Sequence, residues 1–135
     1  MGGGFHDGFT TAPAGGLEYR AGSHLRLRTH ATYGFTVAEP LGEIDIATAA
    51  EVRPLLDAVS SGPAPTLAVD LHATTFFDCA GLSLLSRLHT RVTERGGRLY
   101  LVCDQPLTLR MLRIVGLDEP LRPAPTLEEA LARMS

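Results

Sequence analysis

Cys79 is the residue in this sequence whose type and position come closest to those of a catalytic nucleophile. It directly precedes a stretch that predicts a helix, and a thiol at a helix N-terminus has a lowered pKa and attacks more readily. Phosphatases built on such a thiol hold the phosphate with an arginine six residues further on, but position 85 is Leu and the next arginine is Arg87. We therefore interpret Cys79, like Cys103, as a small buried thiol, and a Cys79-dependent hydrolase stays as an alternative.

Other patterns of catalytic or ligand-binding residues are absent from the sequence. The five histidines are scattered without HxH or HExxH spacing, and the two cysteines form no CxxC pair. Neither a GxxxxGKS/T loop nor a GxGxxG loop occurs. The sequence therefore predicts neither an enzyme nor a metal or cofactor site, and it favours a binding protein.

Two aspartates stand where predicted strands end. Asp45 closes the run GEID, and Asp78 lies in the run FFDCAG, directly before a predicted helix. In an open α/β sheet, ligands and partners meet the loops beyond the carboxyl ends of the strands. The Asp78 carboxylate is placed to accept from the free N–H groups of Ala80 or Gly81. The alternatives are that Asp78 is only a helix cap and that Asp45 only stabilises a turn.

Apolar periodicity predicts the elements that position these residues. Alternation with a period of two indicates strands over residues 25–30 and 35–37, and short apolar runs indicate strands over residues 66–71 and 99–103. Helical spacing indicates helices over residues 48–60, 79–95 and 106–115, and a last helix begins after Thr126. Strands that alternate with helices predict an α/β fold with right-handed crossovers.

Capping residues and apolar stripes add detail to two of these helices. Thr48 and Glu51 form a capping box that opens the first helix, and Pro54 predicts a kink or a later start. The predicted core face of the third helix consists of Leu107, Met111, Ile114 and Val115. Leu109 and Leu112 lie off this stripe, so they are either buried or form an exposed apolar patch.

The composition is that of one ordinary globular domain. The chain has 135 residues, of which 44% are hydrophobic and 20% are charged. Its formal net charge of −3 argues against nucleic acid as a direct partner. No secretory signal and no apolar run long enough to cross a bilayer occur, so we expect a cytoplasmic protein without membrane contact. Residues 1–23 lack apolar periodicity and predict a flexible tail, and residues 24–135 form the domain.

Three landmarks in order resemble a known family. The runs GEIDIATA at residues 42–49, FDCAGL at residues 77–82 and RGGRLYLV at residues 95–102 resemble a STAS domain of the bacterial anti-sigma factor antagonist type. The likeness extends from about Leu25 to the C-terminus. It implies an antagonist-like α/β fold, with a mixed sheet of four to five strands and helices mainly on one face, and no catalytic activity.

The resemblance also implies a binding surface. Members of this family bind an ATPase-like serine kinase that sequesters a sigma factor, and phosphorylation of the antagonist by that kinase breaks the contact. The position that is phosphorylated in relatives is Ala80 here, and a methyl group cannot take a phosphoryl group. Gly81 is expected to let the partner's backbone approach closely. The expected partner-binding residues are Asp45, Asp78, Cys79, Ala80, Gly81 and Ser83.

The missing phosphoacceptor leaves three interpretations open. The protein is a constitutive antagonist that releases a sigma factor, or phosphorylation has moved to Ser83, Thr74 or Thr75, or the module is a STAS scaffold or small-ligand sensor with no sigma-factor role. The expected partner is an anti-sigma factor of the ATPase-like serine-protein kinase type, and a homodimer is compatible with this expectation. The sequence identifies neither the sigma factor nor the anti-sigma factor.

Overall fold

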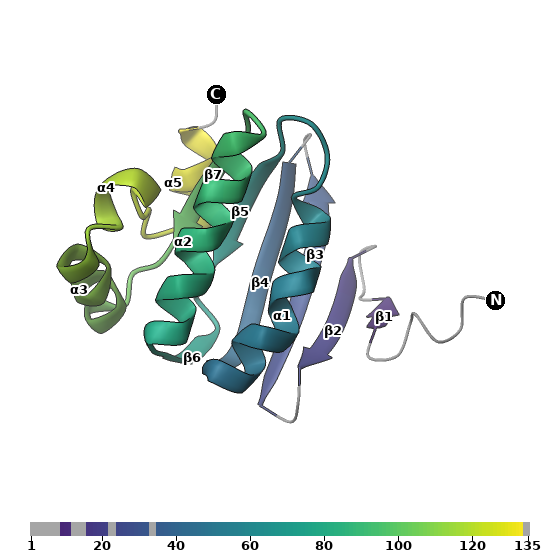
Figure 1. Cartoon of the computed structure of the whole chain (residues 1–135), viewed down its shortest axis with the longest axis horizontal. Coiled ribbons are helices and arrows are strands. Elements are labelled where there is room, and N and C mark those ends of the chain that lie inside the picture. The colour runs from purple at the N-terminus through teal and green to yellow at the C-terminus, as the bar shows by residue number, and fades with distance from the viewer. Residues whose placement is uncertain (1–8, 12–15, 22–23, 33–34, 134–135) are drawn as a thin grey trace.

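A mixed β-sheet organises the computed structural model, which describes residues 9–11, 16–21, 24–32 and 35–133 (Figure 1). The strands are β1 (Phe9–Thr11), β2 (Leu17–Ala21), β3 (Leu25–Thr32), β4 (Phe35–Ile44), β5 (Thr66–Asp70), β6 (Thr74–Phe77) and β7 (Arg98–Val102). The helices are α1 (Ile46–Val59), α2 (Cys79–Glu94), α3 (Pro106–Val115), α4 (Asp118–Leu121) and α5 (Leu127–Ala132).

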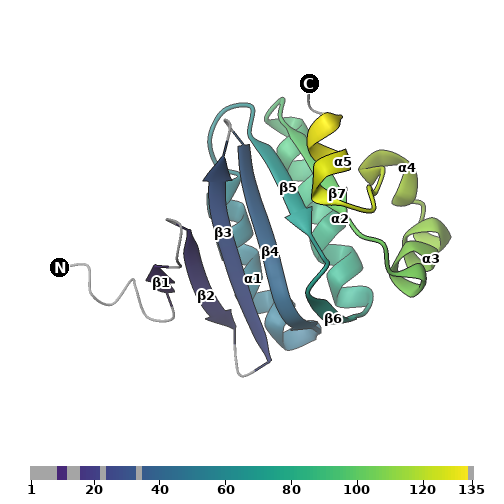
Figure 2. The same cartoon turned by 180° about the vertical axis from the view of Figure 1, so that it is seen from behind.

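The sheet joins an antiparallel half to a parallel half. Its strand order is β1-β2-β3-β4-β5-β7, in which β1 to β4 pair antiparallel and β4, β5 and β7 pair parallel. The short strand β6 pairs parallel with the C-terminal end of β4. Helices α1 and α2 cover one face, and α5 lies on the other (Figures 1 and 2). The expected α/β fold, with a mixed sheet and helices mainly on one face, is confirmed.

Two strands lie within the segment that we expected to be a flexible tail. All five residues of β2 pair with residues Leu25 to Thr29 of β3, and β1 pairs with β2. Tyr19 is half-buried and packs against the main core. The tail prediction is therefore wrong for these strands; the rest of residues 1–23, apart from Gly16, lies outside the described residues. Leu17, Tyr19 and Ala21 alternate with Glu18 and Arg20 in the sequence, and the tail prediction missed this short period of two.

Helix α1 begins two residues earlier than predicted. The capping box is formed by Asp45 and Thr48, not by Thr48 and Glu51. The Thr48 N–H donates to Asp45 Oδ1 at 3.0 Å, and the Asp45 N–H donates to Thr48 Oγ1 at 2.9 Å. Thr48 is thereby the third helical residue and is buried. The helix continues through Pro54 to Val59 instead of starting later.

Helix α3 has the predicted length but buries a different face. It runs from Pro106 to a left-handed cap at Gly116, and Leu112 is fully buried in the core. From the predicted core stripe, Met111 is half-buried and the other three side chains are exposed: Leu107, Ile114 and Val115. Both stripes have helical spacing, so periodicity could not tell which of them faces the sheet.

Candidate partner-docking surface

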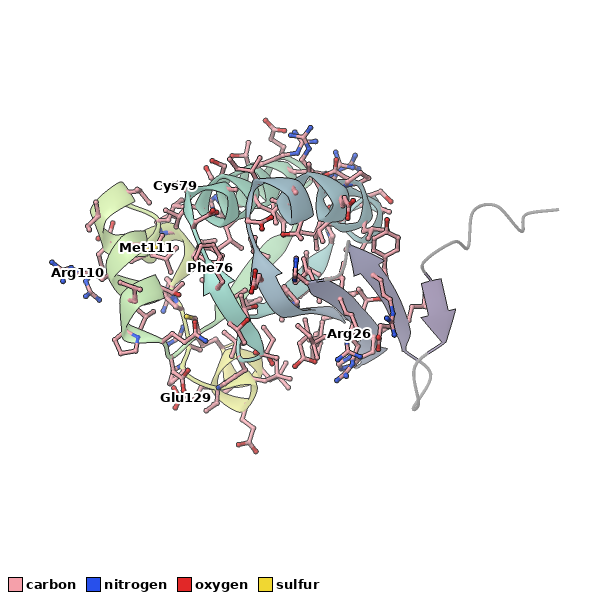
Figure 3. All side chains as sticks on the ribbon, turned by 90° about the horizontal axis from the view of Figure 1, so that it is seen from below. Arg26, Phe76, Cys79, Arg110, Met111 and Glu129 are labelled. Atoms are coloured by element: carbon pink, nitrogen blue, oxygen red, sulfur yellow. The ribbon has the colours of Figure 1, made fainter. Side chains whose placement is uncertain are left out.

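The pairing of β4 with β6 brings two helix starts side by side. Ile44, the last residue of β4, is in register with Phe77, the last residue of β6. Paired strands lie about 4.8 Å apart. The next residues, Asp45 and Asp78, are the N-caps of α1 and α2. The two aspartates that the sequence singled out therefore stand next to each other at the carboxyl end of the sheet, the end seen in Figure 3.

Asp45 uses its charge to hold the start of α1. The N–H of Thr48 donates to its carboxylate, and this hydrogen bond is the main reason why the pKa of Asp45 lies below the ordinary aspartate value. The hydroxyl of Thr48 also donates to the carbonyl of Glu43 at 2.9 Å, which ties the helix start back to β4. The carboxylate thus stays ionised at neutral pH and is positioned by its own helix.

Asp78 plays the same part at the start of α2. Its Oδ1 accepts from the N–H of Ala80 at 2.9 Å, as the sequence predicted. Its carbonyl accepts from the N–H groups of Gly81 and Leu82 at 3.0 and 3.2 Å. Both aspartates therefore fix the backbone of the site and add negative charge beside it.

The two cysteines differ in environment. Cys79 is exposed, so the prediction of a buried thiol is wrong for this residue. It is the first residue of α2, and it lies on the side of the helix start toward Met111 of α3 (Figure 3). Among the described residues, no side chain forms a hydrogen bond with the Cys79 thiol that would activate it as a nucleophile. Cys103 is buried as predicted, and burial raises the pKa of its thiol.

Gly81 does not face a partner. It is buried, and a side chain at this position would begin 2.5–2.8 Å from the ring atoms of Phe77. The absent side chain makes room for this ring and not for another molecule's backbone. The expected partner contact at Gly81 is therefore corrected to internal packing between β6 and α2.

Ala80 and Ser83 line a groove between α1 and α2, which we call the docking groove. It has a volume of about 330 Å³. Its lining residues are Ile46, Ala49, Ala50, Arg53, Ala80, Ser83, Leu84 and Arg87. The floor is mostly apolar, and Ile46 is 79% exposed although it is a large aliphatic residue. Sequence reasoning missed Ile46 because it follows the cap of a helix whose start was predicted two residues later.

Ion pairs hold the two walls of the docking groove together. Arg87 of α2 donates to Asp57 Oδ2 of α1 at 2.8 Å. One turn further along α2, Arg91 donates to the carbonyl of Asp57 at 3.1 Å and to the hydroxyl of Ser60 at 3.3 Å. These bonds fix the spacing of α1 and α2 beyond the groove.

The three hydroxyls considered as alternative phosphorylation sites are not equally accessible. Thr74 is buried, and its Oγ1 donates to the carbonyl of Pro40 at 3.0 Å. Thr75 and Ser83 are exposed. Of the three, Thr74 therefore could not meet a kinase without local opening of β6.

The described ranges contain neither a membrane-spanning helix nor a cluster of metal-ligating side chains. There, no helix is long and apolar enough to cross a membrane. Within the same ranges, no group of three or more His, Cys, Asp or Glu side chains is arranged to hold a metal ion.

Comparison with known proteins gives a consistent picture. The family model of the STAS domain matches residues 26–130. The anti-sigma-F factor antagonist RsfB of Mycobacterium tuberculosis is 30% identical over 98 residues, which cover 73% of this chain and 80% of RsfB. The crystal structure of an anti-sigma factor antagonist from Mycobacterium paratuberculosis superposes with a TM-score of 0.75 at 29% identity, covering 84% of this chain and 96% of that one. The phosphorylated form of the Bacillus cell fate determinant SpoIIAA has the same fold, with a TM-score of 0.65 at 22% identity over 81% of this chain and 99% of its own.

Proposed function

Because this chain belongs to the STAS domain family, among the anti-sigma factor antagonists, we propose that it binds an anti-sigma factor of the serine-kinase type and so releases a sigma factor. Proteins of this family are regulators and not enzymes. RsfB, whose match covers 73% of this chain, is by name an anti-sigma-F factor antagonist, and this name supports an anti-sigma factor as the partner. The absence of a partner for the Cys79 thiol among the described side chains speaks against the hydrolase alternative.

The observation that carries the proposal is the pair of adjoining helix starts beside the docking groove. Ile46, Cys79 and Ser83 are exposed there, and Ala80 is half-buried between them. The nearby carboxylates of Asp45 and Asp78 already accept hydrogen bonds from their own helices. A partner therefore meets a mostly apolar groove that is flanked by the acidic caps Asp45 and Asp78 and also lined by Arg53 and Arg87, and such a surface is suited to protein contact.

Ala80 determines how this contact is regulated. At this position a phosphoserine would add about −1.5 to −2 charges next to two carboxylates. Repulsion and the cost of removing water from the phosphate would then expel a partner. One structural relative, SpoIIAA, exists in a phosphorylated form. Ala80 has no hydroxyl, so the surface of this protein stays in the state that binds, and the amount of protein controls its effect.

The first test adds charge at the centre of the proposed surface. Purified Ala80→Asp should bind the anti-sigma factor kinase encoded in the same genome at least about tenfold more weakly than the unmodified protein, because like charges brought together at an interface repel each other. Binding is measured by calorimetry with ATP and with ADP. Ser86→Asp is the matched control, since Ser86 is an exposed residue of α2 outside the docking groove. Equal affinity of both variants would refute the proposed surface.

Mass spectrometry distinguishes the mode of regulation. After incubation with the kinase and ATP, the unmodified protein should keep its mass, and Ala80→Ser should gain one phosphate. A phosphate on the unmodified protein, at Ser83 or Thr75, would show that the switch has moved. If no anti-sigma factor binds in either nucleotide state, the antagonist role is wrong and a scaffold or sensor role is favoured.

A further inference from the structure

The outer edge of β7 is paired along only part of its length. β7 stands at the end of the strand order, with β5 on one side and no further strand among the described residues on the other. A single bridge from Ala124 covers the C-terminal end of this edge at Val102. The N-terminal end, residues 98–100, borders a second cavity of about 260 Å³, which is also lined by residues of α2 and of the segments that end α4 and α5 (Figure 1).

The hydrogen bonds of β7 show which of its backbone groups face this cavity. The N–H of Arg98 donates to the carbonyl just before β5 at 2.8 Å, and the carbonyl of Val102 accepts from the first N–H beyond β5 at 2.9 Å. In a parallel strand, the residues that bond to one neighbour alternate with residues that bond to the other. Leu99 and Leu101 therefore direct their N–H and C=O groups to the outer edge.

Ala124 shows how a chain pairs with these outward groups. Its N–H donates to the carbonyl of Leu101, and its carbonyl accepts from the N–H of Cys103, both at 2.9 Å. The bonds of a parallel ladder repeat every second residue. Continued by one repeat toward the N-terminus, the ladder would bring Arg122 to the carbonyl of Leu99 and to the N–H of Leu101.

Arg122 instead turns the chain away from β7. It has φ +44° and ψ 63°, a left-handed conformation that is unfavourable for a residue with a side chain. Its N–H donates to the carbonyl of Asp118 at 2.8 Å, and its carbonyl accepts from a guanidinium N–H of Arg133. Among the described residues, Leu99 and the N–H of Leu101 therefore have no backbone partner on the outer side of β7. An added strand would supply these hydrogen bonds.

The charge around the open edge indicates what kind of chain would add. The cavity lining contains no aspartate or glutamate, and it contains His89, Arg98, Arg122 and Arg133. Within the described ranges, no carboxylate lies within 4.0 Å of these three guanidinium groups, whereas Arg87 pairs with a carboxylate of α1. Each arginine is thus available to a different carboxylate of a chain that lies along the edge.

We propose that the open end of β7 binds an extended, acidic peptide segment of another protein, which adds to the sheet beside Leu99. Strand addition to an open sheet edge is a common way to bind peptides. A second copy of this edge fits poorly, because it would bring two sets of arginines together. The cavity shares no lining residue with the docking groove, so this site goes beyond the proposed function and does not depend on it.

The test is an NMR titration of the full chain with a short capped peptide in which valine and glutamate alternate. The amide signals of Leu99 and Leu101 should shift, and exchange of the Leu101 N–H with solvent should slow by at least about tenfold at saturation, because the peptide protects it. A peptide with lysine in place of glutamate should bind at least about tenfold more weakly. A glutamate peptide that is N-methylated at every second residue keeps its charge and should lose binding in the register that blocks its donors.

Two variants address the backbone and the charge separately. Leu99→Pro removes the outward N–H and no bond to β5, and proline is tolerated where the N–H of an edge strand faces outward. It should weaken binding of the glutamate peptide by at least about tenfold. Arg98→Gln should weaken binding by about threefold, since Arg98 is exposed. Arg110→Gln is its matched control, because Arg110 is an exposed arginine of α3 outside the cavity lining (Figure 3).

The peptide series decides the proposal even if Leu99→Pro does not fold, because it uses the unmodified protein. If the glutamate peptide does not bind, or if both N-methylated registers bind as tightly as the unmethylated peptide, strand addition is overturned. Equal loss in Arg98→Gln and Arg110→Gln would likewise overturn it. If the protein alone dimerises with the Leu101 N–H protected, a second copy occupies the edge, and the proposal is wrong.

Discussion

At the start of α2, only a glycine fits at position 81, because any side chain there would collide with a neighbouring ring. The ring of Phe77 fills the space where a Cβ of Gly81 would stand. The sequence predicted that Asp78 caps this helix, because the cap depends on residues two and three positions away. The sequence could not predict the burial of Gly81 or the exposure of Cys79. Both depend on where β6 places Phe77 and where α2 begins relative to the sheet.

Gly81→Ala should destabilise the protein by about 1–3 kcal/mol, because the added methyl group forces the Phe77 ring out of position. At a solvent-exposed helix position the same change would stabilise the protein by about 1 kcal/mol, so the sign of the change in stability shows whether Gly81 is packed against Phe77. Urea unfolding measures the free energy of unfolding. Gly62→Ala is the control, since apart from the neighbouring residues in the chain no atom lies within 4 Å of its added Cβ. A Phe77→Leu background should remove most of the penalty, and a stable Gly81→Ala protein would contradict the packing.

At the scale of elements, the long periodic helices were predictable, and the elements of three or four residues were not. Helices α1, α2 and α3 were found because each repeats its apolar spacing over several turns. β6 has four residues and α4 has four, too few to show a period. The start of α1 was misplaced because Thr48 can form a capping box either with Asp45 before it or with Glu51 after it. In the structure β4 ends at Ile44, so Asp45 is the residue that caps the helix.

The cap of α1 gives stability a defined dependence on pH. The pKa of Asp45 is lowered in the folded protein, so its contribution is complete above the ordinary value of 3.8 and is lost as the pH falls through the folded-state pKa. Asp45→Ala should lower the urea midpoint at pH 7, and Asp45→Asn should largely keep it because asparagine also caps helices. The pH dependence below 3.8 should be weaker in both variants. If the stability of Asp45→Asn falls below pH 3.8 as steeply as that of the unmodified protein, this role of the carboxylate is contradicted.

At the scale of the whole molecule, the alternation of strands and helices predicted the α/β class, while the resemblance supplied the family. The tail prediction missed the two strands before residue 24, because they have only three and five residues and lie among segments rich in Gly and Ala. The sequence also could not reveal that three arginines distant in the sequence line one cavity of about 260 Å³. Arg98, Arg122 and Arg133 come from separate segments that meet only when β7, α4 and α5 pack together.

The position of β2 has a consequence for how the edge of the sheet is protected. β2 occupies one long side of β3, whose other side pairs with β4. Without β2, the N–H and C=O groups along that side of β3 would lie open, and an open strand is a template to which a second chain adds.

A chain that begins at residue 22 should therefore elute from a sizing column as oligomers and bind amyloid dyes on storage. A chain that begins at residue 9 keeps both strands and should elute as the full chain does. If the shorter protein also behaves as the full chain does, β2 has no such role. If the shorter protein aggregates, β1 and β2 protect the edge of β3 from pairing with other chains, and a domain expressed without them would be insoluble.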